Sequence, residues 1–264
     1  MPQKETGTRQ TEKKDRRLPV SVVILALNEA DVIGRCLASA AWADEILVAD
    51  TGSTDATPQI IRAAGARLLR LPWEGFGTTR QKAVASASHD WIFSLDADEE
   101  VTEALRREIE AFLSQIPPPV PACRIRRRSS YLGRWIRFSG WQSDAPVRLF
   151  DRKAGTYNDR PVHESVRIPG RKQTLDGPLL HYTYPTLRSH VEKINRYSDL
   201  GAELLYTRGK RTTPAGAFLR GFLKFLKMYG LRGGFMDGRE GYILARISAF
   251  GVTLKYLKLW RKSR

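Results

Sequence analysis

The segment Trp91-Ile92-Phe93-Ser94-Leu95-Asp96-Ala97-Asp98 decides the fold of this chain, because an apolar, strand-like run ends there in two carboxylates one residue apart. Side chains alternate along an extended segment, so Asp96 and Asp98 are expected to point the same way from the end of the strand. Two carboxylates in that position can share one divalent cation, which in turn can hold a diphosphate. An Asp-x-Asp pattern alone usually marks a solvated turn, so the metal site needs support from the rest of the chain.

Length and composition indicate an ordinary globular protein. The chain has 264 residues, and an apolar content of 42% is ample for one large domain or two small ones. Residues 1–17 are polar and charged and contain no secretory signal, so they are expected to form a disordered lead-in to a cytoplasmic protein. Cys36 falls on the apolar face of an expected helix, and with Cys123 as the second cysteine we predict neither a disulfide nor a zinc site.

Apolar runs alternate with helical patterns over the first hundred residues. Strands are expected at 20–27, 45–49, 67–71 and 91–95, with helices at 31–41, 58–64, 78–87 and 102–113. This alternation is typical of a mostly parallel α/β sheet, whose ligands bind beyond the carboxyl ends of the strands. Three of those ends carry polar clusters, at residues 28–29, 50–55 and 96–98. We therefore expect the three clusters to meet along one edge of the sheet.

The segment Pro117-Pro118-Pro119-Val120-Pro121 must be a non-helical connector. It separates a nucleotide-binding half, residues 18–116, from an acceptor half, residues 122–200. In the second half, residues 122–128 and 147–152 are predicted strands, and the Trp- and Gly-rich residues 133–144 are a predicted loop over a site.

Residues 201–264 are expected to form a basic amphipathic helical tail. The net charge of the chain is +16, and residues 205–264 contain 14 Lys or Arg against two acidic residues, a surplus of 12. Apolar residues recur at helical spacing within 218–229 and 242–260, but neither stretch is apolar enough to cross a bilayer. Such helices either lie among the headgroups of an anionic leaflet or pack on the core with a solvated basic edge, and both interpretations stay open.

Several residues are candidates for sugar transfer from a nucleoside diphosphate, which requires nucleoside recognition, neutralisation of the diphosphate and a base. Asp50 can accept hydrogen bonds from a base or a ribose, and a turn containing Gly52 and Ser53 follows it. Asp55 is interpreted as a helix cap. Asn28 and Glu29 either line the nucleoside pocket or cap the next helix.

Two cations follow the turn Trp73-Glu74-Gly75-Phe76-Gly77. Arg80 and Lys82 either approach the nucleotide or belong to a plain helix surface. Farther along the chain, Arg124 and the run Arg126-Arg127-Arg128 can add phosphate contacts near the site.

The order of the clusters resembles family 2 glycosyltransferases with a GT-A fold. The resemblance is carried by Asn28-Glu29, by Asp50-Thr51-Gly52-Ser53-Thr54-Asp55 and by Ser94-Leu95-Asp96-Ala97-Asp98-Glu99. Other motifs are similar to the bacterial lipopolysaccharide inner-core β-1,4-glucosyltransferases, among them Gly140-Trp141, Arg148-Leu149-Phe150, Val162-His163-Glu164 and Leu180-His181-Tyr182. The resemblance implies a Rossmann-like, mostly parallel α/β sheet followed by C-terminal amphipathic helices. It also implies inverting transfer of a hexose, expected to be glucose, from a UDP-sugar to the heptose region of the inner core.

The resemblance also implies roles for particular residues. Asp50 becomes a nucleoside contact, Asp96 lies near the ribose and the cation, and Asp98 is the direct ligand of Mg²⁺ or Mn²⁺. Glu164 is the candidate catalytic base, with Asp144 in reserve. Family members usually have an acidic pair there, of which His163 replaces one member.

His181 follows a strand at a point where some GT-A enzymes place a third metal ligand, although a structural histidine fits the sequence equally well.

The expected partners are a UDP-sugar, an anionic lipopolysaccharide-core acceptor and the cytoplasmic face of the bacterial inner membrane, without nucleic acid. One alternative is a family 2 enzyme acting on polyprenyl phosphate or a capsule precursor. An alternative of another class is a non-catalytic nucleotide-sugar or polyanion-binding protein. Carboxylates at three strand ends favour an enzyme, because binding a polyanion does not call for acidic clusters.

Overall fold

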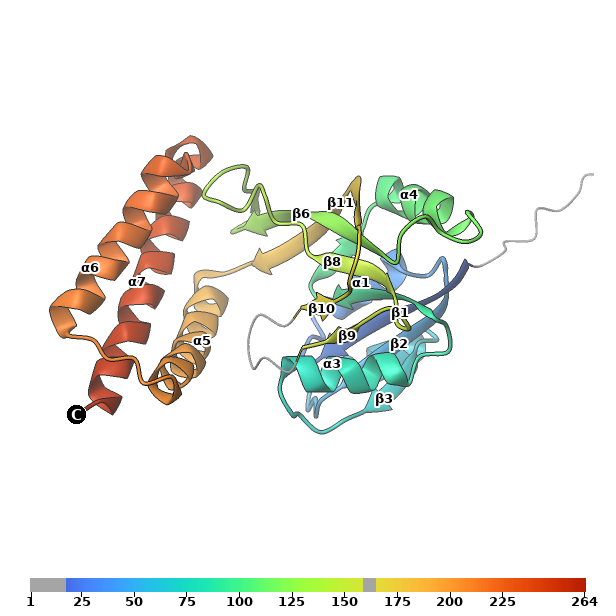
Figure 1. The fold of residues 1–264 in the computed structure, drawn as a ribbon, viewed down its shortest axis with the longest axis horizontal. Helices are drawn as coiled ribbons and strands as arrows, with labels where there is room; N and C mark the ends of the chain where they lie inside the picture. The colour runs from blue at the N-terminus through green and yellow to red at the C-terminus, as the bar shows by residue number, and fades with distance from the viewer. Residues whose placement is uncertain (1–17, 159–164) are drawn as a thin grey trace, which may run out of the picture.

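The computed structural model describes residues 18–158 and 165–264. The predicted lead-in 1–17 and the predicted base Glu164 lie outside these residues. A mixed sheet occupies one part of the molecule and three long helices form the other (Figure 1).

Four parallel strands form the first half of the sheet. They are β1 (Leu18–Ala26), β2 (Ala43–Asp50), β3 (Arg67–Arg70) and β4 (Trp91–Asp96), in the order β3-β2-β1-β4. The helices α1 (Ile33–Ser39), α2 (Thr57–Ala63) and α3 (Phe76–Ala85) alternate with them. The predicted alternation of strands and helices is therefore confirmed.

The sheet continues with strands of both directions. Beyond β4 the order is β8 (Val147–Asp151), β6 (Ala122–Tyr131), β11 (Gln173–Tyr184) and β5 (Glu99–Val101), with β7 (Arg134–Trp135) paired to β6. Strand β8 runs antiparallel to β4 and β6, whereas β11 is parallel to β6 and antiparallel to β5. Helix α4 (Glu103–Leu113) follows β5, and a two-stranded ribbon joins β9 (Thr156–Tyr157) to β10 (Val166–Arg167).

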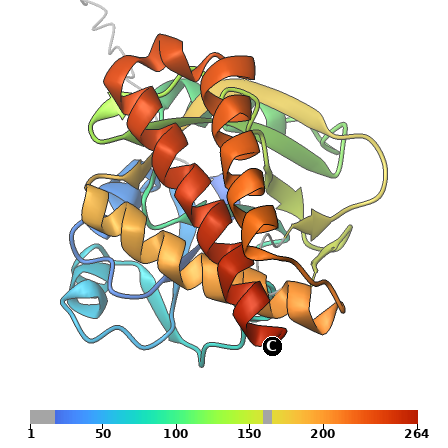
Figure 2. The same ribbon diagram turned by 90° about the vertical axis from the view of Figure 1, so that its left-hand side faces the viewer.

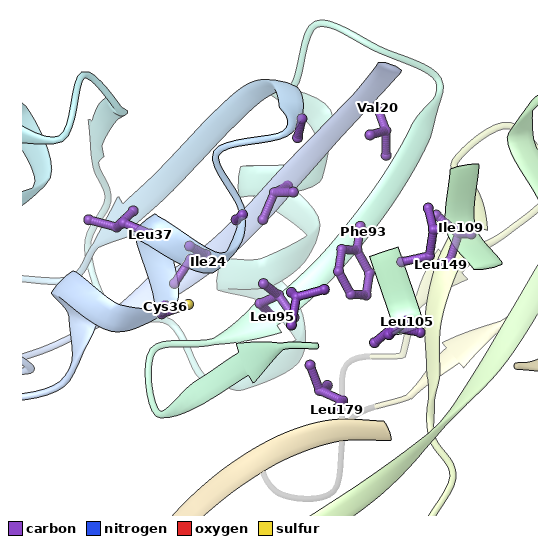
Figure 3. Packing of buried hydrophobic residues seen from close by; sticks show 14 of the residues in the cluster. Val20, Ile24, Cys36, Leu37, Phe93, Leu95, Leu105, Ile109, Leu149 and Leu179 are labelled. Atoms are coloured by element: carbon purple, nitrogen blue, oxygen red, sulfur yellow. The ribbon is translucent and has the colours of Figure 1, made fainter. Parts of the chain in front are cut away.

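The apolar run of β1 suits a central strand that is buried on both faces. Val20, Val22 and Ile24 pack on one side with residues of α1 and α4, and Val23 packs on the other with residues of α3. Figure 3 shows the first of these clusters, in which Phe93 lies close to Ile109 and Leu105. Cys36 is buried, as its place on the apolar face of the helix predicts, and Cys123 is buried as well.

The register of the central strands brings their carboxyl ends level. Ala26, at the end of β1, pairs with Asp50, and the preceding Leu25 pairs with Asp96. The expectation that the polar clusters share one edge of the sheet is therefore confirmed for β1, β2 and β4.

The C-terminal part consists of α5 (Leu187–Thr207), α6 (Pro214–Phe225), a π-helical turn η1 (Leu226–Leu231), a 3-10 turn η2 (Gly234–Asp237) and α7 (Gly238–Lys262). Helices α6 and α7 lie side by side on the outside, and α5 lies between α7 and the sheet (Figures 1 and 2). The boundary predicted at residue 200 falls inside α5. This helix carries apolar residues at helical spacing, Leu187, Val191 and Ile194 among them, although the side chains that it buries are His190, Ser198 and Ala202.

Within residues 18–158 and 165–264, no helix has the length and apolarity needed to span a bilayer.

Candidate active site

A cleft of about 1620 Å³ opens beyond the carboxyl edge of the sheet. One wall comes from the strand ends and their loops, with Glu29, Asp96 and Asp98. The other comes from α5 and α7, with Lys193 and Lys255. The helices that follow the sheet thus complete the cleft.

Asp98 and His181 contact each other at the sheet edge. Asp98 lies in the two-residue turn between β4 and β5, and β5 pairs with β11 so that His181 stands opposite Glu99. The His181 Nε2 atom is 3.3 Å from the Asp98 Oδ2 atom. On the other side of the ring, Nδ1 is within hydrogen-bond distance of the hydroxyls of Ser129, at 3.3 Å, and Thr183, at 3.1 Å. A ring oriented through one nitrogen while the other faces a carboxylate is suited to metal ligation.

Asp96 has different partners from Asp98, although both line the cleft. Strand β4 ends at Asp96 and Asp98 belongs to a turn, so the alternation of an extended strand does not reach Asp98. Arg80 contacts Asp96 Oδ1, and Arg148 Nη2 lies 2.5 Å from Oδ2. Burial alone would raise the pKa of Asp96, but the charges of Arg148 and Arg80 outweigh it and hold the pKa well below its ordinary value. Both oxygens are therefore engaged by guanidinium groups.

Among residues 18–158 and 165–264, no cluster of three or more His, Cys, Asp or Glu side chains could hold a metal ion. The donor set that fits a divalent cation is the pair Asp98 and His181. Carboxylate oxygen suits Mg²⁺ or Mn²⁺, imidazole nitrogen is accepted by transition metals, and diphosphate oxygens can complete the coordination.

Buried arginines connect the sheet edge to the strands behind it. Glu99 is almost fully buried, and its Oε1 atom lies 2.6 Å from Arg148 Nη2 and 3.3 Å from Arg127 Nη1. Its other oxygen accepts the backbone N–H of Asp96 at 2.9 Å. Arg127 also donates through Nε to Asp144 Oδ2 at 2.9 Å. Cations from α3, β6 and β8 thus fix the carboxylates at this edge, since buried charges require partners.

The loops after β1 and β2 are joined by hydrogen bonds. The Asn28 N–H donates to Ser53 Oγ at 2.9 Å, Asn28 Oδ1 accepts the N–H of Thr54 at 2.8 Å, and Asp50 Oδ1 accepts the N–H of Ser53 at 3.1 Å. Asn28 has a positive φ of 55°, a conformation that asparagine tolerates. Gly52, with a φ of 113°, occupies a conformation that favours glycine. The predicted residues Asn28, Asp50, Gly52 and Ser53 are therefore brought together.

Asp55 binds backbone N–H groups of these loops, whereas Glu29 faces the cleft. Asp55 accepts the N–H groups of Thr57, at the start of α2, and of Ala30, at 3.0 and 3.1 Å, in agreement with the capping interpretation. The Glu29 side chain lines the cleft. Burial, followed by the negative charge of Asp98, raises the pKa of Glu29 to about 7.

The two cations predicted on α3 have separate surroundings. Arg80 is buried, contacts Asp96 and lines the cleft. Lys82 is instead bound by both oxygens of Glu74, at 2.6 and 2.7 Å, on the exposed side of the helix. The structure thus places Arg80 at the site and Lys82 on the surface, because residues two apart on a helix face different directions.

Sequence reasoning gave Arg148 and Glu99 no role in the site. Arg148 is 52 residues from its partner Asp96 in the chain and 49 residues from its partner Glu99. The available signal was the charged Arg148 within the mostly apolar strand β8; β5 is the short segment Glu99-Glu100-Val101, in which Glu99 does not stand out. Of the two base candidates, Asp144 lines the cleft while Arg127 holds its Oδ2 atom; Glu164 lies outside the described residues.

The family model and two similar proteins all indicate a glycosyltransferase. The model for "Glycosyl transferase family 2" matches residues 21–174, more than half of the chain. The lipopolysaccharide core biosynthesis glycosyltransferase LpsC of Rhizobium meliloti is 29% identical over 93% of this chain and 93% of its own. The uncharacterized glycosyltransferase RP128 of Rickettsia prowazekii is 30% identical, covering 91% of this chain and 86% of its own length.

Solved structures resemble the chain more distantly. Glucosyl-3-phosphoglycerate synthase from Mycobacterium tuberculosis, solved with Mn²⁺, UDP and glucosyl-3-phosphoglycerate, is 24% identical. The match covers 42% of this chain and 44% of that one, with a TM-score of 0.35. A similarity of that extent does not locate a nucleotide or a cation in this chain.

Proposed function

Because the chain belongs to glycosyl transferase family 2 and has the mostly parallel α/β sheet of the GT-A class, we propose that it transfers a hexose from a UDP-sugar to the heptose region of a lipopolysaccharide core. Glucose is the proposed hexose. The observation that carries the proposal is the Asp98–His181 pair in a cleft at the level carboxyl ends of the strands. The name of the Rhizobium relative supports the core as acceptor.

Asp98 and His181 are the residues that would hold Mg²⁺ or Mn²⁺, which when bound supplies positive charge for the leaving diphosphate. Ser129 and Thr183 keep the His181 ring in place. Arg80 and Arg148 fix Asp96, whose proposed role is a ribose contact beside the cation rather than direct ligation.

The nucleoside is proposed to contact the joined loops after β1 and β2. Asp50, Gly52 and Ser53 contribute from one loop, and Asn28 and Glu29 from the other. Their mutual hydrogen bonds preorganise the loops, which lowers the ordering cost of binding.

Six cations lining the cleft favour an anionic acceptor. None of them has a carboxylate partner among the residues that the structure describes: Arg124, Arg167, Lys172, Lys193, Arg196 and Lys255. The deeper Arg80, Arg127 and Arg148 are all ion-paired. Phosphate or carboxylate groups on a core oligosaccharide match this outer set.

The proposed reaction is a single displacement. The acceptor hydroxyl loses its proton to a carboxylate base, its oxygen bonds to the anomeric carbon, and the bond to UDP breaks with inversion of configuration. Glu164 remains the first candidate for the base and Asp144 the reserve. The acceptor is proposed to be lipid-linked, which places the reaction at the cytoplasmic face of the inner membrane.

The test is mass spectrometry of a heptose-containing core acceptor after incubation with a panel of nucleotide sugars and Mn²⁺. We expect one hexose to be added from a UDP-sugar, and an axial or equatorial assignment by NMR to show inversion. Transfer only to polyprenyl phosphate or a capsule precursor, or binding without turnover, would support the alternatives and reject the core acceptor.

The role of the Asp98–His181 pair in binding the cation can be tested with a matched control in the same chain. His181→Asn should raise the Mn²⁺ concentration needed for half-maximal transfer by about 10- to 100-fold. His89→Asn removes a second His–Asp contact, 2.8 Å from Asp44 at the surface, and should leave that concentration unchanged. Equal effects of the two substitutions would contradict the assignment of Asp98 and His181 as the residues that hold the cation.

A further inference from the structure

Helix α6 has a row of exposed apolar side chains that nothing in the described part of the chain covers. At about 100° per residue, positions spaced i, i+1, i+4, i+5 and i+8 fall on one side of a helix. In α6 and its continuation these are Phe218, Leu219, Phe222, Leu223 and Leu226. The opposite side carries Ala217 and Gly221, which are buried; a Cβ at Gly221 would meet Thr253 of α7. The helix therefore packs through its small residues and leaves its large ones outside.

The same surface extends over the connection between α6 and α7. Leu231 is 87% exposed, and Phe235 and Met236 are also exposed. The Tyr229 ring packs edge-on against Phe235, with ring centres 6.3 Å apart, and so joins the connection to the helix. These eight residues, Phe218, Leu219, Phe222, Leu223, Leu226, Leu231, Phe235 and Met236, are called the α6–η2 surface below. Single exposed apolar residues are normal on a soluble monomer, but a gathering of them on neighbouring elements marks an interaction site.

The elements that carry the α6–η2 surface, and α7 beside them, also carry exposed cations. Arg220 and Lys227 are exposed on α6 and η1, and Arg232 and Arg246 are exposed nearby. Beyond residue 207 the two acidic residues already have partners: buried Asp237 accepts the N–H groups of Arg137 and Phe138, and Glu240 is 3.3 Å from Arg134. The partner of this surface must therefore be apolar and anionic at once.

A second copy of the chain does not meet this requirement. A symmetric interface would place the same cations opposite one another, and like charges across an interface cost affinity. A nucleic acid would satisfy the charge but leave the row of Phe and Leu in water. An anionic bilayer offers phosphate headgroups at the level of the cations and acyl chains below them.

We propose that the α6–η2 surface binds the interface of an anionic bilayer, with α6 lying in the membrane plane. Arg220 and Lys227 contact headgroup phosphates, and Leu231 at the exposed tip enters the acyl region. Figure 2 shows α6 and α7 on the outer side of the molecule, in front of α5. Helix α7 also lines the cleft through Lys255, so docking holds the cleft beside the lipid surface. The docking itself does not depend on the proposed function, although it would present a lipid-linked acceptor to the site.

Vesicle flotation of the full chain tests the docking. We expect binding to vesicles of phosphatidylcholine with phosphatidylglycerol, at least about tenfold weaker binding to phosphatidylcholine alone, and weakening in high salt. Leu231→Asp should reduce binding to the anionic vesicles by about tenfold or more. Ile116→Asp is the matched control, because Ile116 is 95% exposed and lies in the connector before β6. It should bind like the unmodified chain.

Charge-reversal variants and the oligomeric state of the chain provide further tests of the docking. Lys227→Glu should weaken anionic binding more than Arg107→Glu, which reverses an exposed charge on α4. Equal binding of the unmodified chain, Leu231→Asp and Ile116→Asp would overturn the proposal. A dimer that Leu231→Asp dissociates, with unchanged vesicle binding, would also overturn it. Transfer to a delipidated acceptor should survive Leu231→Asp, so failure of docking and failure of the proposed transferase activity are distinguishable.

Discussion

At the scale of single residues, Asp96 and Asp98 show how neighbouring carboxylates acquire separate tasks. Asp96 ends a strand between two guanidinium groups, whereas Asp98 sits in the next turn beside an imidazole. A low pKa keeps Asp96 ionised, and that charge in turn stabilises Arg148 deep in the sheet. The first carboxylate therefore organises the edge of the sheet, and the second is available to a ligand.

Arg148→Met tests whether the ion pairs of Asp96 stabilise the edge of the sheet. The substitution removes the cation that lies closest to both Asp96 Oδ2 and Glu99 Oε1 and leaves Arg127 at 4.0 and 3.3 Å from them. Breaking a buried pair costs about 3–5 kcal/mol in free energy of unfolding. Urea denaturation measures the change. Arg126→Met, which removes an exposed contact to Asp176, should cost less than about 1 kcal/mol. A loss for Arg148→Met as small as that of Arg126→Met would show that the buried network does not stabilise the fold.

Glu29 predicts a pH dependence of stability. Its pKa is about 7 in the folded chain against an ordinary value of 4.5, because of burial and then the charge of Asp98. Between these values the native state holds a proton that the unfolded state has lost, so the free energy of unfolding falls as the pH rises. The contribution is complete below pH 4.5 and is lost by about pH 7.

Glu29→Gln should flatten this fall, and urea denaturation from pH 4 to pH 8 in the presence of a chelator measures it. Parallel stability profiles for the two proteins would contradict the raised pKa. Glu74→Gln is a suitable control, since Glu74 contacts Lys82 on the exposed side of α3.

The sequence indicated the candidate residues whose signal is local. Asp98, Asp50 and Asn28 follow apolar runs, and the ends of those runs coincide in the sheet. The buried ion pairs were not predictable in the same way, because Arg148 and Asp96 are adjacent only through the pairing of β4 with β8. Lys82 was indistinguishable from Arg80 until the direction of α3 was known.

At the scale of elements, the parallel half of the sheet follows from periodicity, but the irregular strand β11 does not. Strand β11 contains Gly177, and its pairing with β6 shifts register between Leu175 and Leu179. An interrupted alternation of this kind hides a strand in the sequence. Helix α5 does show apolar residues at helical spacing, and a capping box between Thr186 and Ser189 marks its start.

Gly177→Ala tests the close approach that the irregularity of β11 permits. A Cβ at this position would lie 2.5 Å from the Leu105 Cα atom and 2.6 Å from its backbone N, at the start of α4. Neither atom belongs to a flexible side chain, so we expect a loss of about 1–3 kcal/mol in free energy of unfolding. Gly34→Ala in α1, whose nearest neighbour would be 3.9 Å away, should instead be neutral or stabilising by about 0.5–1 kcal/mol. Thermal denaturation of both variants measures these changes in stability. Equal Tm values for the two variants would contradict the close packing of β11 on α4.

At the scale of the whole molecule, the C-terminal helices belong both to the cleft and to the outer surface. Sequence patterning predicted helices within 218–229 and 242–260, but it left open whether they pack on the core or face a membrane. In the structure α7 buries Leu244, Ala245 and Leu259 and also lines the cleft, while α6 turns its large apolar residues outward. Packing on the core is therefore confirmed for one side of these helices, and the exposed side of α6 is the one to which the membrane proposal applies.

The double variant Lys193→Gln, Lys255→Gln tests whether α5 and α7 complete the acceptor site. Both cations line the cleft without a carboxylate partner in the described chain, so their loss should raise KM for a phosphorylated acceptor about tenfold and leave KM for the UDP-sugar unchanged. For the unmodified protein, salt should raise the acceptor KM through screening, and the double variant should respond less. Lys210→Gln, an exposed site between α5 and α6, is the matched control and should change neither constant. An equal rise of KM for a dephosphorylated acceptor would mean that the helices contribute shape rather than charge to recognition.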